Sequence, residues 1–437
     1  MHRLKFFNFS QTKRTKQITA AIVVLIVAGI GTYLLTGSRA AVPYASSTAD
    51  NGSVTSGATK KACTGASDGS CVAFGSAATC PLSAFSATNQ PACWQPFTAT
   101  SPLNSQLPAS PKLASYSSQV MSHLATYNWQ FTSSTAFKFE VSTDSRPVYF
   151  AHPSDPLIKL VSCSGSCKDQ SGASIVGTSF HVPLNAVPGT NGDSHTDVIE
   201  TDTGDEYGFW QASVNFTNDT MTATNGDKLS TVTDSGVQLQ VGADAAHIAL
   251  SGGLVRPAEL LAGTIKHALV LDVPCVANGS TSGIPSSVYP ALYLSGHTIA
   301  SDGCLDSSKG DGPPYGSLFK LNMSDAEIAA SGAPSWEKTI MTALAHYGAY
   351  VSDTDTSSDG IYIFRQSAPS WTNLNVQDLF QSADSQLGGS DGTYYNSPSG
   401  CVNNSLSAGC NYGLQSSIPI PINKFEVVDP CVPQKTC

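Results

Sequence analysis

One uninterrupted apolar run near the N-terminus constrains the whole chain, because it decides on which side of a membrane the rest folds. The 18 residues Ile18–Leu35 contain no charged side chain. A run of this length is enough to cross a bilayer and is longer than the usual apolar core of a signal peptide. Five basic residues precede the run, and such residues keep an N-terminus in the cytoplasm: Arg3, Lys5, Lys13, Arg14 and Lys16. We expect a cytoplasmic basic segment over 1–17, a transmembrane anchor or signal segment over 18–36, and an extracytoplasmic remainder.

A second outcome for this segment stays open. Ser38-Arg39-Ala40 resembles a small-residue cleavage site. The expected location is therefore the cell membrane, with one span and an extracytoplasmic C-terminal domain, or the secreted fraction if the chain is cleaved after Ala40. The length of the run favours the anchor.

All 12 cysteines follow the apolar run. An even number of cysteines in an exported chain predicts disulfide bonds, because the thiols meet an oxidising compartment. We expect each cysteine to pair with its nearest neighbour in sequence, which gives 63–71, 80–93, 163–167, 275–304, 401–410 and 431–437, although sequence alone does not fix the connectivity. No cysteine spacing matches a zinc site.

The charge balance excludes one class of partner. The chain has 22 basic and 32 acidic residues, and six of the basic ones lie in residues 1–40, which contain no acid. The remainder therefore carries 16 basic and 32 acidic residues, a net charge of −16, and we expect no nucleic-acid binding. The run Asp353–Gly360 is similar to a calcium loop, but its glycine comes two places late. A turn explains it better, and the sequence predicts no metal and no cofactor.

The rest of the chain divides by composition. Residues 37–110 are rich in Ser, Thr, Gly and Pro and contain four cysteines, so we expect a disulfide-containing stalk. Residues 111–437 contain short alternating runs separated by turn signals, such as 137–142, 147–151, 195–201, 206–214, 349–354 and 361–366. The best helix signal covers Ser335–Tyr347. We predict an all-β, jelly-roll-like antiparallel β-sandwich with a few short helices over 111–437.

Residues 252–275 (GGLVRPAELLAGTIKHALVLDVPC) place four charged or polar side chains inside an apolar passage. Pro257 and Gly263 fit the start and the end of a short helix, and 264–273 reads as a strand with His267 on its apolar face. One interpretation is a core histidine with an Arg256–Glu259 ion pair. The other is a cleft lined by these three residues.

A second polar group lies on a predicted hairpin over 195–214. His195 and Asp197 lie on one strand, and Tyr207 and Trp210 lie on its partner. A surface strand with scattered acids is the plainer interpretation. The functional one gives catalytic roles to His195, Arg256, Glu259 and His267, and substrate-binding roles to Asp197, Tyr207 and Trp210.

Two resemblances accompany these residues. The segments GDSHTDVIETDTGDEYGFWQA, GGLVRPAELLAGTIKHALVLDVP, VYPA, GPPYGSLFKL, TALAHYGAYVSDT and KFEVVD resemble, in this order, a family of exported bacterial β-sandwich proteins of unestablished activity, over about residues 93–430. Gly208 stands where that family has a glutamate. The stretch VPYASSTADNG…SDGSCVAFGS resembles the opening strands of a carbohydrate-binding module, truncated to far less than the roughly hundred residues of such a sandwich.

The resemblances imply a role with cell-surface polysaccharide. Two classes of function remain open for the residues above. One is an enzyme that acts on the glycan through a histidine and its neighbouring charged groups. The other is a protein without catalysis, either one that binds the glycan or a catalytically inert surface adhesin or structural envelope protein. Convergence of the candidate residues on one open cleft would favour the enzyme.

Overall fold

The chain folds into two units. The computed structural model describes residues 58–62, 70–74, 80–126, 137–140, 146–189, 192–238, 240, 242–273, 275–277, 283–291, 304, 312–354, 361–367, 369–377, 379 and 420–437. The first unit, Met1–Thr79, contains one antiparallel hairpin of β1 (Ala58–Ala62) and β2 (Ser70–Phe74). The predicted membrane segment 18–36 lies outside the described residues, and no helix within them is long and apolar enough to span a bilayer.

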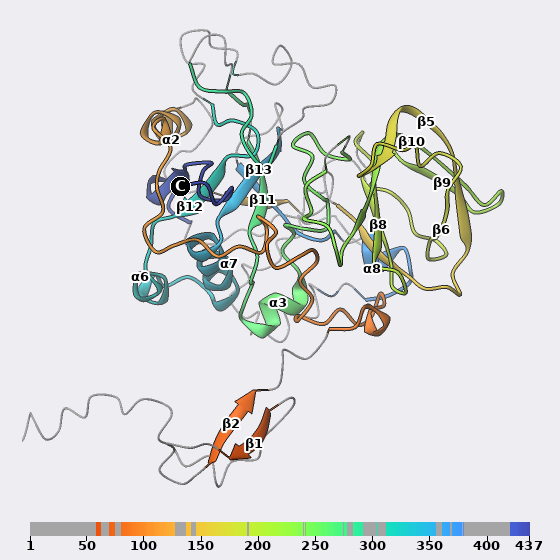
Figure 1. The fold of residues 1–437 in the computed structure, drawn as a ribbon, viewed down its shortest axis with the longest axis horizontal. Helices are drawn as coiled ribbons and strands as arrows, with labels where there is room; N and C mark the ends of the chain where they lie inside the picture. Colours follow the sequence, from red (N-terminus) through yellow and green to blue (C-terminus); the bar gives the residue numbers. More distant parts are fainter. Residues whose placement is uncertain are drawn as a thin grey trace, which may run out of the picture. The chain divides into compact units, whose positions relative to one another are not determined.

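The second unit, Cys80–Cys437, contains two mixed sheets (Figure 1). The seven-stranded sheet has the order β4-β7-β8-β10-β5-β6, with β9 paired to β10. Its strands are β4 (Val148–Ala151), β5 (Leu157–Asp169), β6 (Ser179–His181), β7 (Thr196–Glu200), β8 (Asp205–Trp210), β9 (Ser213–Asn215) and β10 (Thr220–Ser230). The pairs β4–β7 and β5–β10 are parallel, and the other pairs are antiparallel.

The six-stranded sheet has the order β15-β12-β13-β11-β14-β3. Its strands are β3 (Phe137–Glu140), β11 (Leu269–Val273), β12 (Leu318–Leu321), β13 (Ala349–Thr354), β14 (Ile361–Phe364) and β15 (Phe425–Val428). The pairs β11–β13 and β3–β14 are parallel.

The described structure is therefore mostly β with few helices, as predicted, but the antiparallel arrangement predicted for it is wrong. Period-two alternation reports which face a side chain takes and says nothing about the direction of the neighbouring strand. The one pairing that a local turn signal fixed is confirmed, since β7 and β8 form an antiparallel hairpin through Gly204, whose φ of 77° suits glycine.

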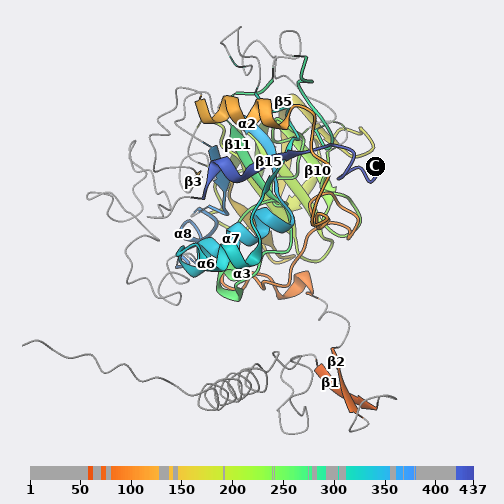
Figure 2. The same cartoon turned by 90° about the vertical axis from the view of Figure 1, so that its left-hand side faces the viewer.

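The helices are short and lie mainly by the six-stranded sheet. They are α2 (Ser117–Thr126), α3 (Pro257–Ala262), α6 (Asp325–Ala330), α7 (Ser335–His346) and α8 (Pro369–Thr372), with 3₁₀ turns η2 (Leu82–Ala84) and η4 (Ile422–Lys424). α2 contacts β15, and α7 contacts β12 (Figures 1 and 2). The predicted helices over 257–262 and 335–347 are both present, and Gly263 ends α3 in the left-handed region.

The two faces of the seven-stranded sheet pack against different cores, because successive side chains of a strand point to opposite faces. Val148 and Ile199 face a large core shared with the six-stranded sheet, whereas Tyr149 and Val198 face a smaller one. The large core also receives side chains from the segment predicted to be a stalk, namely Phe85, Trp94, Phe97 and Leu103. The second unit begins at Cys80. These four apolar side chains are widely spaced in the sequence, so they leave no periodic signal.

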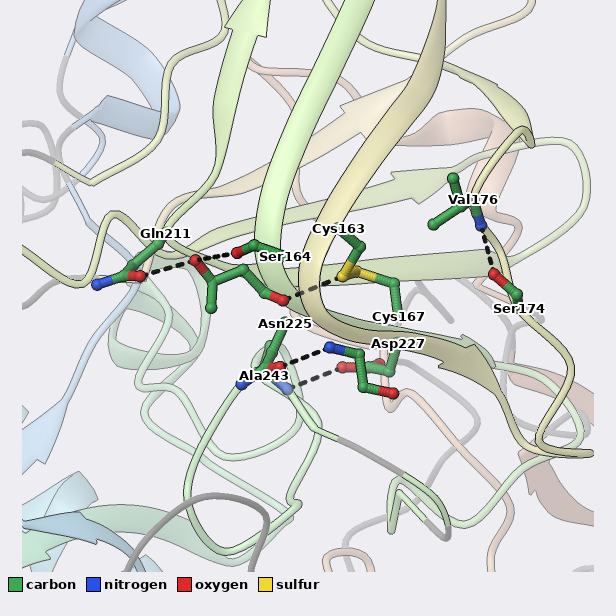
Figure 3. Close-up of a disulfide and its surroundings, with 11 residues drawn as sticks. Cys163, Ser164, Cys167, Ser174, Val176, Gln211, Asn225, Asp227 and Ala243 are labelled. Atoms are coloured by element: carbon green, nitrogen blue, oxygen red, sulfur yellow. Dashed lines mark hydrogen bonds between the residues drawn. A yellow bond between two sulfur atoms is a disulfide. The ribbon is translucent and has the colours of Figure 1, made fainter.

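Four predicted disulfides are confirmed, namely 80–93, 163–167, 275–304 and 431–437. The predicted pairs 63–71 and 401–410 involve residues outside the described part. The Cys163–Cys167 bond links two residues of β5 where the pairing with β10 shifts register (Figure 3). The Asn225 side chain of β10 accepts a hydrogen bond there from the Ser166 amide at 3.0 Å.

Candidate functional site

The structure brings three of the predicted catalytic residues together at the start of α3. Pro257 at the first helical position places Glu259 where its carboxylate reaches back to the Arg256 amide, 3.3 Å away. The Arg256 guanidinium donates to Glu259 Oε1 at 2.6 Å. His267 Nε2 lies 3.0 Å from the same oxygen.

These three residues lie in the core and not at the rim of a cleft. Arg256 is 6% exposed, and Glu259 and His267 are each 2% exposed. Arg256 also donates to the Trp94 carbonyl at 2.7 Å and lies over the Trp94 ring. His267 Nδ1 faces the Ala268 carbonyl at 2.8 Å. Both ring nitrogens thus face acceptors, and an imidazolium that donates from both satisfies the arrangement.

The charge of Glu259 is held by its neighbours. Burial raises the pKa of this carboxyl, but Arg256 and His267 more than offset that effect and lower the pKa to about 2. An ionised Glu259 that is paired with Arg256 and bonded to His267 forms a closed network. Each of its members is bonded to another protein group, so we interpret the network as one that stabilises the fold.

His195 has a different set of neighbours. It precedes β7, is 4% exposed, and has a pKa lowered to about 3 by burial and by the nearby Arg146, against smaller opposing effects of Asp193 and the Phe209 backbone. The ring is therefore neutral at pH 7. The four predicted catalytic residues thus form one closed network and one separate buried histidine.

Asp197 belongs to a buried group of carboxyls that sequence reasoning missed. Strand register places Asp197 on β7, Gly208 on β8 and Asp227 on β10 directly opposite one another. Glu206, two residues before Gly208 on β8, points to the same face. Asp197, Glu206 and Asp227 are each at most 1% exposed.

Burial and mutual repulsion oppose the simultaneous ionisation of these carboxyls. Burial raises the pKa of Asp197 and Asp227 well above the usual range, and the neighbouring Glu206 raises both further. Burial raises the pKa of Glu206 to about 7, against hydrogen bonds from Ser251 and Asp197. The Ser251 hydroxyl donates to Glu206 at 2.9 Å. The Ala243 amide donates to Asp227 at 3.1 Å (Figure 3). A hydrogen bond between two carboxyls needs one of them protonated.

One arginine balances this region. Arg146 and Asp244 form a buried ion pair at 3.0 Å, and the guanidinium lies over the Phe364 ring. The guanidinium also donates to the Ser352 hydroxyl of β13 at 3.4 Å. This pair joins segments beside both sheets. Of the buried carboxyls, only Glu206 had a signal in the sequence, namely the alternation Asp205-Glu-Tyr-Gly208 on β8. The positions of the others relative to it depend on strand register.

The two aromatic residues predicted to bind substrate have separate environments. Tyr207 is 2% exposed and stacks on Phe180 with ring centroids 4.3 Å apart, in the smaller core. Trp210, at the end of β8, is half-buried and donates from its indole nitrogen to Asp193 at 2.9 Å. Tyr207 therefore packs on an aromatic neighbour inside the protein.

Two adjoining pockets lie elsewhere, on the six-stranded sheet, and both include Gln106, Leu107 and Pro108. The apolar pocket has a volume of about 410 Å³ and includes Leu318 and Tyr350. These two residues are opposite each other on β12 and β13, so one face of the sheet contributes to the pocket wall. The polar pocket has a volume of about 450 Å³.

The polar pocket gathers hydrogen-bonding groups from β12, α6 and α7. His346 Nε2 faces Asp325 Oδ1 at 2.7 Å, and the Gln106 amide faces His346 Nδ1 at 3.2 Å. An Nε2–H tautomer satisfies both contacts, with the ring donating to Asp325 and accepting from Gln106. Lys320 and Asn322 also line this pocket. The arrangement presents both donors and acceptors, as recognition of a hydroxyl-rich ligand requires.

One group of described residues has the spacing of metal ligands, but two of its three members are bonded to each other. His123 lies near Cys275 and Cys304, but these cysteines form a disulfide and offer no thiolate. No protein-family model, curated protein or solved structure matches this chain.

Proposed function

We propose that this protein is exported and binds cell-surface polysaccharide through the two adjoining pockets of the six-stranded sheet. The single observation that carries the proposal is the pairing of an apolar with a polar pocket across the shared residues Gln106, Leu107 and Pro108. Glycans present both apolar ring faces and hydroxyls. Neighbouring apolar and polar surfaces therefore suit two consecutive sugar units.

Export is the second part of the proposal. Four disulfides in the described residues are what an oxidising compartment favours. The protein is held at the membrane by residues 18–36, or released after cleavage behind Ala40. Packing of the two sheets as a β-sandwich belongs to the same proposal and is supported by the core that both sheets share. The resemblance to exported bacterial proteins and to a carbohydrate-binding module agrees with it.

Binding is favoured over catalysis. A glycoside hydrolase needs two carboxyls that face one bond, about 5–10 Å apart and open to the substrate. Glu259 is closed off by Arg256 and His267, and Asp197 and Glu206 are fully buried. The open polar groups of the two pockets instead suit recognition without a chemical step.

Retention on a polysaccharide panel tests the proposal. The full chain in detergent is passed over immobilised plant, bacterial and fungal polysaccharides, and both retention and release of reducing sugar are measured. We expect retention on at least one polysaccharide without sugar release.

Two matched variants locate the site. Gln106→Ala removes a side chain that lines both pockets, whereas Gln119→Ala changes an exposed residue of α2. Q106A should weaken retention and Q119A should not. Retention on no polysaccharide, or equal retention by Q106A and the wild type, would show the proposal to be wrong.

A further inference from the structure

We propose that the polar pocket holds the carboxylate of an acidic sugar unit, with the Lys320 ammonium as its counter-ion. This inference rests on the proposed polysaccharide function and names the class of sugar: a uronate. Lys320 lies in β12, between β13 and β15, and is only 6% exposed. It nevertheless lines the polar pocket.

Lys320 has no partner for its charge. Among the described residues, no carboxylate or hydrogen-bond acceptor lies within bonding distance of its ammonium. A lysine is rarely this buried without a partner, because an ammonium with little water around it is costly unless an anion compensates. The side chain therefore presents an unsatisfied positive charge in a pocket large enough for a sugar ring.

The acids around it are already engaged. Glu426, the register partner of Lys320 on β15, accepts from the Asn322 amide at 3.0 Å. Asp325 is bound to His346. Glu327 accepts from the Ser324 amide and hydroxyl at the start of α6, both at 2.8 Å, and lies 3.8 Å from Lys424.

The same acids restrict the charge of the ligand. Asp325 and Glu327 line the same pocket. They oppose a doubly charged group such as phosphate more strongly than a singly charged one, because like charges repel. A carboxylate carries one negative charge and needs only one strong ionic partner. The sugar hydroxyls can then bond to Asn322, Asp325 and His346, which line the same pocket.

Calorimetry on the full chain in detergent tests the inference. Sodium glucuronate and glucose are titrated at matched ionic strength, so that the two probes differ in one carboxylate. We expect glucuronate to bind at least about tenfold more tightly than glucose, as one charge-assisted hydrogen bond provides. Its affinity should fall with added salt.

Three variants assign the effect to one residue. Lys320→Met keeps the aliphatic length without the charge, and it should lose the preference for glucuronate. Lys320→Arg keeps the charge and should retain part of that preference. Lys424→Met removes a neighbouring exposed lysine that is not among the pocket residues, and it should bind like the wild type. Thermal melting of each variant confirms that it is folded.

The outcomes separate this inference from the proposed function. Equal binding of both sugars, or unchanged glucuronate binding by K320M, overturns the assignment of Lys320. If K320M is retained on polysaccharide like the wild type, the proposed function stands without this inference. If no polysaccharide is retained but glucuronate binding depends on Lys320, the anion pocket stands and the polysaccharide function does not.

Discussion

His267 Nε2 lies 3.0 Å from Oε1 of Glu259, and both side chains are 2% exposed. The polar residues of the apolar passage 252–275 are thus held by one another inside the core. This pairing explains why polar side chains are found inside the core, since buried charges are tolerated when they are paired and hydrogen-bonded.

The first prediction concerns the histidine of this pair. His267→Gln replaces a ring that bonds through both nitrogens with a shorter amide, and leaves Glu259 with Arg256 alone. We expect the free energy of unfolding to fall by roughly 1–3 kcal/mol in urea titrations at pH 7. Polysaccharide retention by the folded fraction should not change. Normal stability combined with lost retention would instead assign His267 to the binding site.

The second prediction is the pH dependence of Glu259. Its folded-state pKa of about 2 is below the ordinary value of 4.5, so its contribution to stability is present above pH 4.5 and is lost as the pH falls toward 2. Glu259→Gln should therefore destabilise the protein more at pH 7 than at pH 3. Urea unfolding of both proteins across this range measures the difference. A gap that is independent of pH would mean that the carboxylate charge is not what Arg256 and His267 stabilise.

The third prediction has the opposite sign and concerns Glu206. Because burial raises its pKa from 4.5 to about 7, its contribution is fully present below pH 4.5 and is lost as the pH rises through 7. Such a shift corresponds to about 3 kcal/mol. Glu206→Gln imitates the protonated carboxyl, so it should match the wild type at pH 4 and exceed its stability at pH 8. Thermal melting at the two pH values decides this, and a variant less stable at pH 8 would show that an ionised Glu206 is required.

The features that could be predicted from sequence were local ones. The β7–β8 hairpin follows from the turn around Gly204, α3 from Pro257 and Gly263, and the four confirmed disulfides from near neighbours in sequence. In each case a few adjacent residues carry the physical cause, whether a backbone angle, a helix end or a short loop to close.

What could not be predicted depends on contacts between distant segments. Asp227 approaches Asp197 only because β10 and β7 both pair with β8 in a particular register. The pockets exist because residues 106–108 lie beside β12, more than two hundred positions later in the chain. Alternation gives the face of a side chain but neither its neighbour strand nor the loop that covers it.

The last prediction concerns Gly208, which stands where a glutamate is expected from the resemblance to exported proteins. A Cβ at this position would lie 3.1 Å from Asp227 Oδ2 and 3.4 Å from the Ala243 side chain. Glycine therefore leaves the space that the carboxyl of Asp227 occupies. A glutamate here would add another carboxyl to Asp197, Glu206 and Asp227 in a region with one neighbouring arginine ion pair.

Gly208→Ala should lower the free energy of unfolding by about 1–3 kcal/mol through overpacking, and Gly208→Glu should lower it further. Gly192→Ala is the matched control, because a Cβ there meets no atom within 4 Å. Urea unfolding at pH 5 and pH 8 should show a larger penalty for G208E at pH 8, where the added carboxyl would have to ionise beside the others. If G208A were as stable as G192A, the spacing between β8 and Asp227 would not depend on the absence of a side chain at position 208.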